Sequence, residues 1–372
     1  VHSHYTYWQE KRRMKTGSLR QIDKAALQIR ENVERVIVGK SSVLELALVA
    51  VLCEGHILLE DVPGIGKTML ARSVARSLGC TFRRVQCTPD LLPSDITGTY
   101  VYNQKTGEFE FRAGPVFAQV VLADEINRAT PRTQSALLEA MEERQVTVEG
   151  DTRPLPRPFL VLATQNPIEL EGTFPLPEAQ MDRFLLRLRL GYPTEEEDGV
   201  ILDRFAERNP IDELMAVVSA EEILELQQMC RTVLVRPEVR QYIIRLVHAT
   251  RHHPQLEIGA SPRAMLGLFH AAQALAAIRG REYVIPDDVK YLAPFVLEHR
   301  IIPRAQSHLR GHTAADILGE VLGLGSVDED DLYGAMDWLV GRQRRIEGKL
   351  AKRHLEEGCL VLFDLTSVYY TG

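Results

Sequence analysis

The sequence is poor in cysteine and in long apolar runs, and it has fewer basic than acidic residues. Five cysteines are scattered through 372 residues without a C-x-x-C pair, which disfavours a zinc site or a disulfide framework and favours a reducing compartment. The longest apolar run, 43–53, contains Glu45 and falls short of the roughly 18 residues that a membrane span requires. No apolar leader is visible near the start. Together these absences predict a soluble cytoplasmic protein.

The charge balance is acidic. The chain has 44 basic and 51 acidic residues, a net charge of −7, which disfavours non-specific binding to nucleic acid. Hydrophobic residues make up 45% of the chain and charged residues 26%, as in globular proteins with a buried core. At about 150 residues per domain, the length predicts two to three domains.

Four segments differ in pattern. Residues 1–18 are basic and aperiodic, and Met14 within them is a candidate native start. Residues 19–192 alternate helical patterns with the apolar runs 56–59, 120–123 and 159–163, which predicts buried parallel strands in an α/β sheet. After a turn at 191–193, residues 193–322 are predicted to be helical, over 220–233, 237–252, 262–278 and 287–299. Residues 323–372 begin at a glycine-rich hinge and change pattern again.

A glycine-rich loop follows the first predicted strand. Residues 60–68 read Glu-Asp-Val-Pro-Gly-Ile-Gly-Lys-Thr and open a helix predicted over 69–78, which is the setting of a nucleotide phosphate loop. There the N–H groups of the loop would meet the β-phosphate, Lys67 would neutralise β and γ oxygens, and Thr68 would bind Mg²⁺. Asp61 departs from the pattern, because it stands where the first glycine is usual.

Polar residues end the next two predicted strands. Asp124 and Glu125 follow 120–123, at the carboxyl edge where parallel sheets bind ligands. Asp124 would hold Mg²⁺ through water, and Glu125 would orient and deprotonate the attacking water. Asn166 follows 159–163, where it could contact the γ-phosphate. An acidic surface turn and an Asn that stabilises a turn before proline are the alternatives.

Taken together, these residues resemble the MoxR branch of the AAA+ ATPases. The runs from Asp124 to Met141 and from Pro175 to Phe184 look like that family's signatures, and the similarity covers roughly 19–322. It implies an αβα sandwich with a central parallel sheet and a phosphate loop, followed by an all-helical lid domain, with ATP and Mg²⁺ as cofactors.

The resemblance also implies roles for single residues. Asn166 matches sensor 1, Arg183 the arginine finger that reaches a neighbouring subunit's nucleotide, and Arg263 the sensor 2 arginine. Arg128 and Arg132 are alternative contacts to the neighbour. The segment 36–39 matches the lining of the adenine pocket. The nucleotide-binding residues expected are Val38, Gly39, Pro63, Gly64, Ile65, Gly66, Lys67, Thr68 and Met69.

Two alternating stretches predict hairpins. One pairs 100–103 with 108–111 and resembles the hairpin inserted in helix 2 of this clade. The other pairs 145–148 with 153–155 and resembles the hairpin before sensor 1. They would face a ring surface or pore and hold a client protein, or else simply close the edge of the sheet.

The tail resembles a different family. Residues 328–333 and 360–367 are similar to part of an insertion-sequence transposase with an RNase-H-like core, in which Asp364 would match the first metal-binding carboxylate. One carboxylate cannot support two-metal chemistry, so we interpret 324–372 as a fused fragment. A family-specific helical extension is the alternative.

The resemblance thus implies an ATPase that drives chaperone-like remodelling of a partner, often a protein with a von Willebrand factor A domain. A trans arginine finger implies a homo-oligomeric ring, and the resemblance implies that the ring is a hexamer. Two other functions stay open: a DNA-stimulated motor, which the acidic charge disfavours, and a nucleotide switch that does not hydrolyse ATP.

Overall fold

The computed structural model describes residues 19–167, 172–206 and 208–323. Five of the described strands form one parallel sheet in the order β2-β5-β8-β1-β9, which confirms the predicted α/β class. The three apolar runs are its central strands, and each is buried along most of its length. The strands are β1 (Ile57–Glu60), β2 (Phe82–Gln86), β5 (Val120–Asp124), β8 (Leu160–Gln165) and β9 (Leu186–Leu188).

Alternate residues of the strands serve two apolar cores. Leu122 and Leu162 pack in one core with helices α2 and α3 and the helical residues 19–34. Val121 and Val161 pack in the other with helices α4 and α5. Because successive side chains of a strand point to opposite faces, a sheet covered on both sides needs apolar runs without polar alternation. The helices are α2 (Ser41–Leu52), α3 (Lys67–Ser77), α4 (Pro93–Thr97) and α5 (Pro131–Glu143).

Two strands of the sheet were not predicted from the sequence. The first, β2, pairs with β5 alone and carries exposed arginines, so its pattern lacks an apolar run. The second, β9, is three residues long and pairs with β1. Both lie at sheet edges, where a strand has one neighbour and tolerates polar residues.

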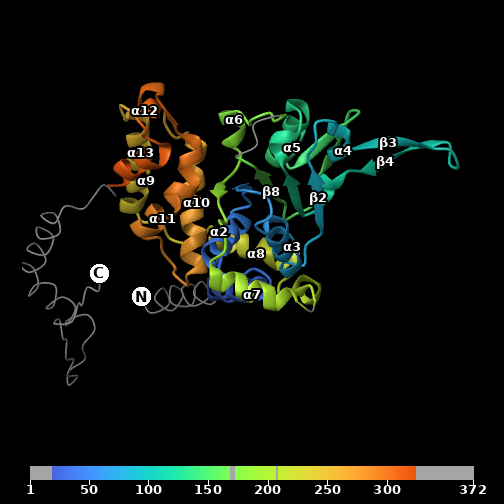
Figure 1. Ribbon diagram of the computed structural model, residues 1–372, viewed down its shortest axis with the longest axis horizontal. Coiled ribbons are helices and arrows are strands. Elements are labelled where there is room, and N and C mark those ends of the chain that lie inside the picture. The colour runs from blue at the N-terminus through green and yellow to red at the C-terminus, as the bar shows by residue number, and fades with distance from the viewer. Residues whose placement is uncertain (1–18, 168–171, 207, 324–372) are drawn as a thin grey trace, which may run out of the picture. The chain divides into compact units, whose positions relative to one another are not determined.

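Residues after β9 are mainly helical, as predicted (Figure 1). The predicted helix 262–278 matches α10, and 237–252 matches α9. The prediction of an all-helical segment needs one correction, because β10 (Leu256–Ile258) and β11 (Ile302–Pro303) form a short antiparallel pair. The helices after β9 are α7 (Glu195–Phe205), α8 (Ala220–Cys230), α9 (Pro237–His252), α10 (Pro262–Ile278), α11 (Pro286–Leu297), α12 (Ala305–Leu309) and α13 (Ala314–Leu322), with 3-10 turns at Pro210–Glu213 and Glu298–Arg300. Before β9 lie the short helix α6 (Glu178–Met181) and 3-10 turns at Pro115–Phe117 and Ile126–Arg128.

Both predicted hairpins are present. The first consists of β3 (Gly98–Asn103) and β4 (Glu108–Ala113), and it extends away from the sheet as a two-stranded ribbon (Figure 1). The second consists of β6 (Gln145–Val148) and β7 (Asp151–Pro154), which pair across the residues Glu149 and Gly150.

No helix among the described residues is long and apolar enough to cross a membrane. The predictions for residues 1–18 and for the transposase-like tail 324–372 fall outside the described residues. The tail prediction, including the role of Asp364, therefore stays a prediction.

Candidate functional site

Three polar segments meet at the carboxyl edge of the sheet. The loop 61–66 follows β1, Asp124 ends β5, and Asn166 follows β8. Because β5, β8 and β1 are adjacent and parallel, the ends of these strands lie side by side. The structure thus brings together Lys67, Thr68, Asp124, Glu125 and Asn166, which all line one cavity of about 240 Å³.

The glycine-rich loop has the backbone that glycine permits. Gly64 and Gly66 have φ values of +87° and +91°, a region that strains residues with a Cβ. Gly66 is the N-cap of α3, whose first turn has no acidic residue. The free N–H groups and the positive end of the helix dipole therefore point toward the cavity, which favours an anion there.

Lys67, the first residue of α3, lies beneath the loop. Its Nζ donates a hydrogen bond to the carbonyl oxygen of Asp61 at 2.6 Å. Burial lowers the pKa of Lys67, and the nearby Asp124, Asp61 and Glu125 oppose that shift. The ammonium group is thus held inside the cavity among acidic residues, where a phosphate group could accept its remaining N–H groups.

Asp124 and Glu125 have different surroundings. Asp124 is 9% exposed and accepts a hydrogen bond from the Thr164 hydroxyl on β8 at 2.6 Å. Glu125 has a left-handed backbone, with φ +57°, and its N–H donates to the same hydroxyl at 2.8 Å. Thr164 thereby fixes the main chain at the end of β5 and turns the Glu125 side chain toward the cavity.

Two residues of β2 that the sequence analysis missed complete the cavity. Arg84 donates to one Asp124 oxygen through Nε at 3.1 Å and through its terminal nitrogen at 2.6 Å. Gln86 donates to a Glu125 oxygen at 3.0 Å, and Arg128 forms an ion pair with Glu125 at 3.2 Å. Alternate spacing on a strand puts Arg84 and Gln86 on one face, but this edge strand was not itself predicted.

A larger cavity of about 510 Å³ adjoins the first, and Pro63, Gly64, Gly66 and Met69 line both. Its walls are largely apolar, as in sites that take a planar base. The expected residues Val38 and Ile65 line it, whereas Gly39 does not. The other lining residues are Val36, Ile37, Lys40, Leu190, Tyr192, Pro193, Asp198, Ile201 and Phe205.

Gly39 acts on this cavity through close packing. Its φ is +72°, and a Cβ placed there would lie 1.6 Å from Oε1 of Glu197. Glu197 accepts a hydrogen bond from the Thr194 N–H at the start of α7 and pairs with Lys40 at 3.8 Å. A side chain at position 39 would therefore strain the backbone and push the Glu197 carboxylate away from Thr194 and Lys40.

The donor set suits Mg²⁺. Thr68 and Asp124 offer hydroxyl and carboxylate oxygens, which that ion prefers. In the described part of the chain, no group of three or more His, Cys, Asp or Glu residues could hold a metal. Such a pair of ligands fits an ion that keeps several waters and is otherwise bound by the phosphates of its nucleotide.

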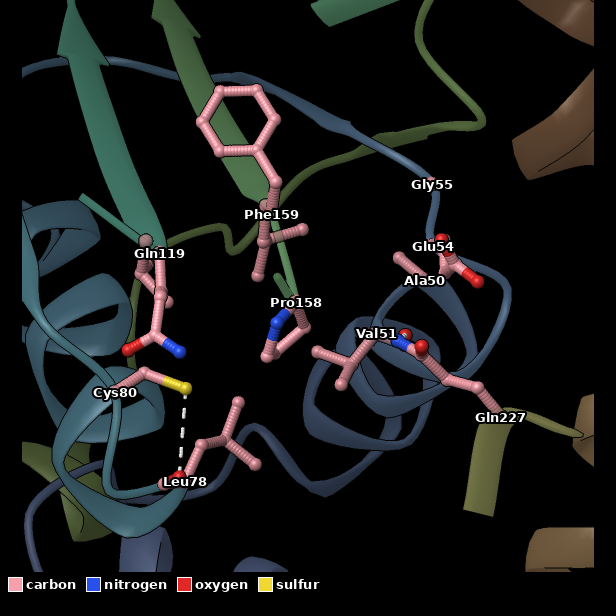
Figure 2. Close-up of a pocket in the computed structure, with 12 residues that line it drawn as sticks. Ala50, Val51, Glu54, Gly55, Leu78, Cys80, Gln119, Pro158, Phe159 and Gln227 are labelled. Carbon is pink, nitrogen blue, oxygen red and sulfur yellow. Dashed lines mark hydrogen bonds between the residues drawn. The ribbon is translucent and has the colours of Figure 1, made fainter. Parts of the chain in front are cut away.

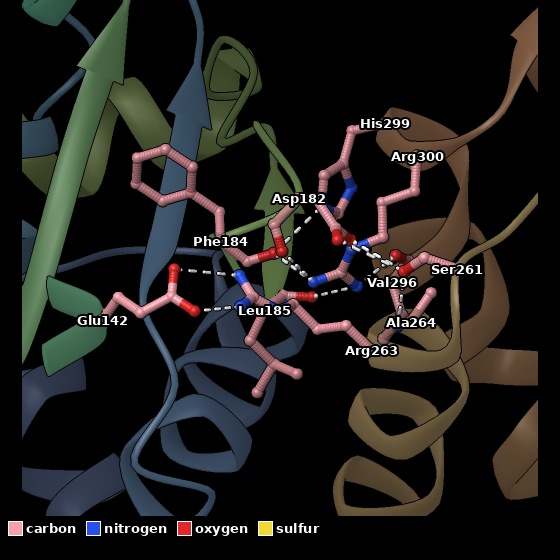
Figure 3. A network of polar contacts seen from close by, with 10 residues as sticks. All are labelled: Glu142, Asp182, Phe184, Leu185, Ser261, Arg263, Ala264, Val296, His299 and Arg300. Carbon is pink, nitrogen blue, oxygen red and sulfur yellow. Dashed lines mark hydrogen bonds and ion pairs between the residues drawn. The ribbon is translucent and has the colours of Figure 1, made fainter. Parts of the chain in front are cut away.

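Arg183 and Arg263 lie outside both cavities and meet on one carboxylate. Arg183, just before β9, pairs with Glu142 of α5 at 2.9 Å, and Arg263 of α10 pairs with the same carboxylate. Figure 3 shows Arg263 directed toward Glu142. The structure thus places both predicted arginines together, but apart from the cavity that Lys67 and Asp124 line. Arg132 is exposed at the start of α5.

A buried arginine joins the residues around Arg183 to the helical segment. Arg300 pairs with Asp182 at 2.8 Å and donates to the Phe184 carbonyl at 2.6 Å, and Ser261, the N-cap of α10, donates to Asp182 at 3.2 Å (Figure 3). Burial lowers the pKa of Arg300 to about 10, with Asp182 opposing, so the group is charged at neutral pH.

A third cavity lies at the opposite edge of the sheet. Figure 2 shows its lining, which includes Gln119 and Phe159, the residues just before β5 and β8. Its volume is about 10 Å³, the space of one water molecule at most. This cavity is therefore a packing defect, and the carboxyl edge is the candidate site.

Comparisons with known proteins agree with this geometry. Residues 56–186 match the model described as "ATPase family associated with various cellular activities (AAA)", and residues 248–321 match "AAA lid domain". The Bacillus subtilis (strain 168) protein YeaC, described as uncharacterized, is 51% identical over 292 residues, or 78% of this chain and 91% of YeaC. Chaperone MoxR1 of Mycobacterium tuberculosis is 48% identical over 279 residues, or 73% of this chain and 74% of MoxR1.

One solved structure gives the same result. A candidate ATPase from Cytophaga hutchinsonii, known from a crystal structure, superposes with a TM-score of 0.78 at 40% sequence identity. The match covers 84% of this chain and 97% of that protein.

Proposed function

The chain belongs to the MoxR family of AAA+ ATPases, and we propose that it binds ATP with Mg²⁺ and hydrolyses it to ADP and phosphate. One observation carries the proposal: Lys67, Glu125 and Asn166, from three separate segments, line a single cavity next to a larger apolar one. The phosphates would occupy the first cavity and the adenine base the second.

Each residue has a role that its position supports. The N–H groups of 64–66 and the Lys67 ammonium would bind the phosphates. Thr68 and Asp124 would hold Mg²⁺, which neutralises charge on phosphate oxygens when bound. Arg84 would then have to leave the Asp124 carboxylate. Glu125 would accept a proton from the attacking water, and Asn166 would orient that water or contact the γ-phosphate.

The assembly we propose is a ring, in which Arg183 reaches the nucleotide of the next subunit. Arg183 lies outside the phosphate cavity of its own subunit, which supports a role at the nucleotide of a neighbour. Arg263 would stabilise phosphate charge once released from Glu142. From the family we infer that the ring is a hexamer. We also infer that it remodels a client protein, such as a protein with a von Willebrand factor A domain. A cytoplasmic location stays a prediction.

The test compares ATP binding and turnover in wild type, Lys67→Ala and Glu125→Gln. We expect Lys67→Ala to weaken binding of a fluorescent ATP analogue at least about tenfold, because it removes a charge-assisted contact. Glu125→Gln should keep binding and lose roughly 100-fold in turnover, since it removes the general base. Glu143→Gln, an exposed carboxylate of α5 outside both cavities, is the matched control.

Failure of the wild type to bind ATP in the presence of Mg²⁺ would overturn the proposal. Tight binding without turnover, at all protein concentrations, would favour the nucleotide switch instead. A large increase in turnover on adding duplex DNA would favour the DNA motor.

A further inference from the structure

Asp61 occupies the first position of the phosphate loop, where glycine is usual, and its side chain reaches beyond the loop. Its Oδ2 accepts hydrogen bonds from the N–H of Leu190 and from the N–H of Gly191, the latter at 3.3 Å. These two N–H groups follow β9, 129 and 130 residues later in the chain. A carboxylate therefore ties the phosphate loop to the segment 190–193.

The strand register explains why a side chain is needed there. The last partners of the β1–β9 ladder are Leu59 and Leu188, so Leu190 lies level with Asp61. The N–H of Asp61 donates to the Gln165 carbonyl on β8 at 3.1 Å, and its carbonyl accepts from Lys67 at 2.6 Å. The N–H and the carbonyl of Asp61 therefore bond to β8 and to Lys67, and its carboxylate makes the hydrogen bonds to the residues after β9.

The segment tied in this way forms a wall of the larger cavity. Leu190, Tyr192 and Pro193 all line it. On its other side, Lys40 donates to the Tyr192 carbonyl at 3.0 Å. The segment 190–193 is thus held at two points. Asp61 of the phosphate loop binds the N–H groups of Leu190 and Gly191, and Lys40 binds the carbonyl of Tyr192.

We propose that Asp61 is a positioning residue that couples the phosphate loop to the wall of the base cavity. Phosphates that order the loop also order 190–193 through the carboxylate, so the two cavities bind a nucleotide as one site. The proposal rests on the proposed nucleotide binding. It implies that a glycine at this position, although it restores the usual loop sequence, weakens binding.

The experiment measures two quantities in full-length wild type, Asp61→Gly and Asp61→Asn. One is hydrogen exchange at the amides of Leu190 and Gly191, with and without inorganic tripolyphosphate. The other is the Kd of a fluorescent ADP analogue. We expect Asp61→Gly to exchange these amides at least about tenfold faster, because their acceptor is lost. Its Kd should rise about tenfold, since the wall is no longer pre-organised.

Asp61→Asn keeps one acceptor oxygen, which suffices for both contacts, so its Kd should rise less than about threefold. Tripolyphosphate, which has no base, should slow the exchange of both amides in wild type but not in Asp61→Gly. Glu60→Gln is the matched control: this neighbour pairs with Arg187 and Arg189, leaves the Asp61 contacts in place, and should keep the wild-type Kd.

Two results would overturn the coupling. One is an Asp61→Gly protein with wild-type exchange and wild-type Kd. The other is faster exchange at Leu190 and Gly191 with an unchanged Kd, because the link would then exist without affecting binding. A wild type that binds no nucleotide would refute the proposed function. That failure is distinguishable from failure of the Asp61 link, because hydrogen exchange at Leu190 and Gly191 without ligand tests the link by itself.

Discussion

Glu125 shows how a single residue is constrained for one task. A left-handed backbone costs a non-glycine residue about 1–3 kcal/mol unless its surroundings enforce it. Here the Glu125 N–H is held by the Thr164 hydroxyl at 2.8 Å, and its carboxylate is held by Gln86 at 3.0 Å. The strain directs the proposed general base into the cavity, which a relaxed strand end would not do.

His56 makes the stability of the sheet depend on pH. Its Nε2 lies 3.1 Å from the Met141 carbonyl, and its Nδ1 accepts from the Val161 N–H at 3.0 Å, so the neutral ring satisfies both partners. Burial lowers the pKa of His56 to about 4, and the Met141 carbonyl opposes this while Arg144 adds to it. In the unfolded chain the pKa returns to about 6.5.

We therefore expect acid to destabilise the protein through His56. Below pH 6.5 the unfolded chain binds a proton that the folded state excludes down to about pH 4, so stability present above pH 6.5 is lost as the pH falls. The loss is about 2 kcal/mol between pH 7 and pH 5. We would measure the free energy of unfolding by urea at pH 7 and at pH 5. The loss of stability between the two pH values should be about 2 kcal/mol smaller in His56→Asn than in wild type. An equal loss in the variant would contradict the assignment.

At the scale of elements, the two hairpins are joined to each other. Arg153 of β7 lies 4.2 Å from the centre of the Phe111 ring on β4 and donates to the Tyr100 hydroxyl on β3 at 3.0 Å. Farther along the ribbon, Tyr102 and Phe109 are 53% and 68% exposed, and their rings lie 5.3 Å apart. Arg153 thus anchors the base of a ribbon whose outer aromatic pair is exposed.

Removing that anchor should loosen the ribbon without unfolding the sheet. We expect Arg153→Ala to lose the cation–π contact with Phe111 and to be cleaved severalfold faster by chymotrypsin within 98–113. Arg112→Ala is the control, because Arg112 is exposed on the same strand as Phe111 and has the opposite side-chain direction. Equal cleavage rates for the two variants would show that Arg153 does not hold the ribbon.

At the scale of the whole molecule, Glu142 connects the helical segment to the sheet. It holds Arg183 and Arg263 together, while Arg300 and Ser261 bind Asp182 next to Arg183. Both predicted arginines therefore depend on contacts that cross between the two parts. A shift of α10 would move Arg263 directly and would pull on the segment that carries Arg183.

Ring formation with a trans arginine gives a definite mixing result. Arg183→Ala and Lys67→Ala should each be nearly inactive, because one lacks the finger and the other lacks nucleotide. In an equal mixture, about a quarter of the interfaces pair an intact phosphate loop with an intact finger, so turnover should recover to about that fraction. The wild-type specific rate should also rise with protein concentration. A mixture that stays inactive would show that Arg183 does not act in trans.

Local pattern was sufficient for the phosphate loop, the three buried strands and the residues that end them. Each of these features is encoded by a few neighbouring residues: the loop by its glycines and lysine, the strands by short apolar runs, and the strand ends by the polar residues that follow those runs. The sequence alone therefore predicted the α/β class, which the structure confirms, and named the five residues that the structure brings to one cavity: Lys67, Thr68, Asp124, Glu125 and Asn166. The prediction of the hairpins rested on the same local alternation and was confirmed.

Only the tertiary structure decided how these residues are held. Arg84 meets Asp124 across 40 residues, Arg263 meets Glu142 across 121, and Asp61 meets Leu190 across 129. No local pattern encodes such pairs. The first and third depend on strand order and register, with β2 beside β5 and β9 beside β1, and the second depends on how α10 lies relative to α5. The sequence alone does not show whether a charged side chain is solvated or pairs with a distant residue, because that depends on which segments the fold brings together.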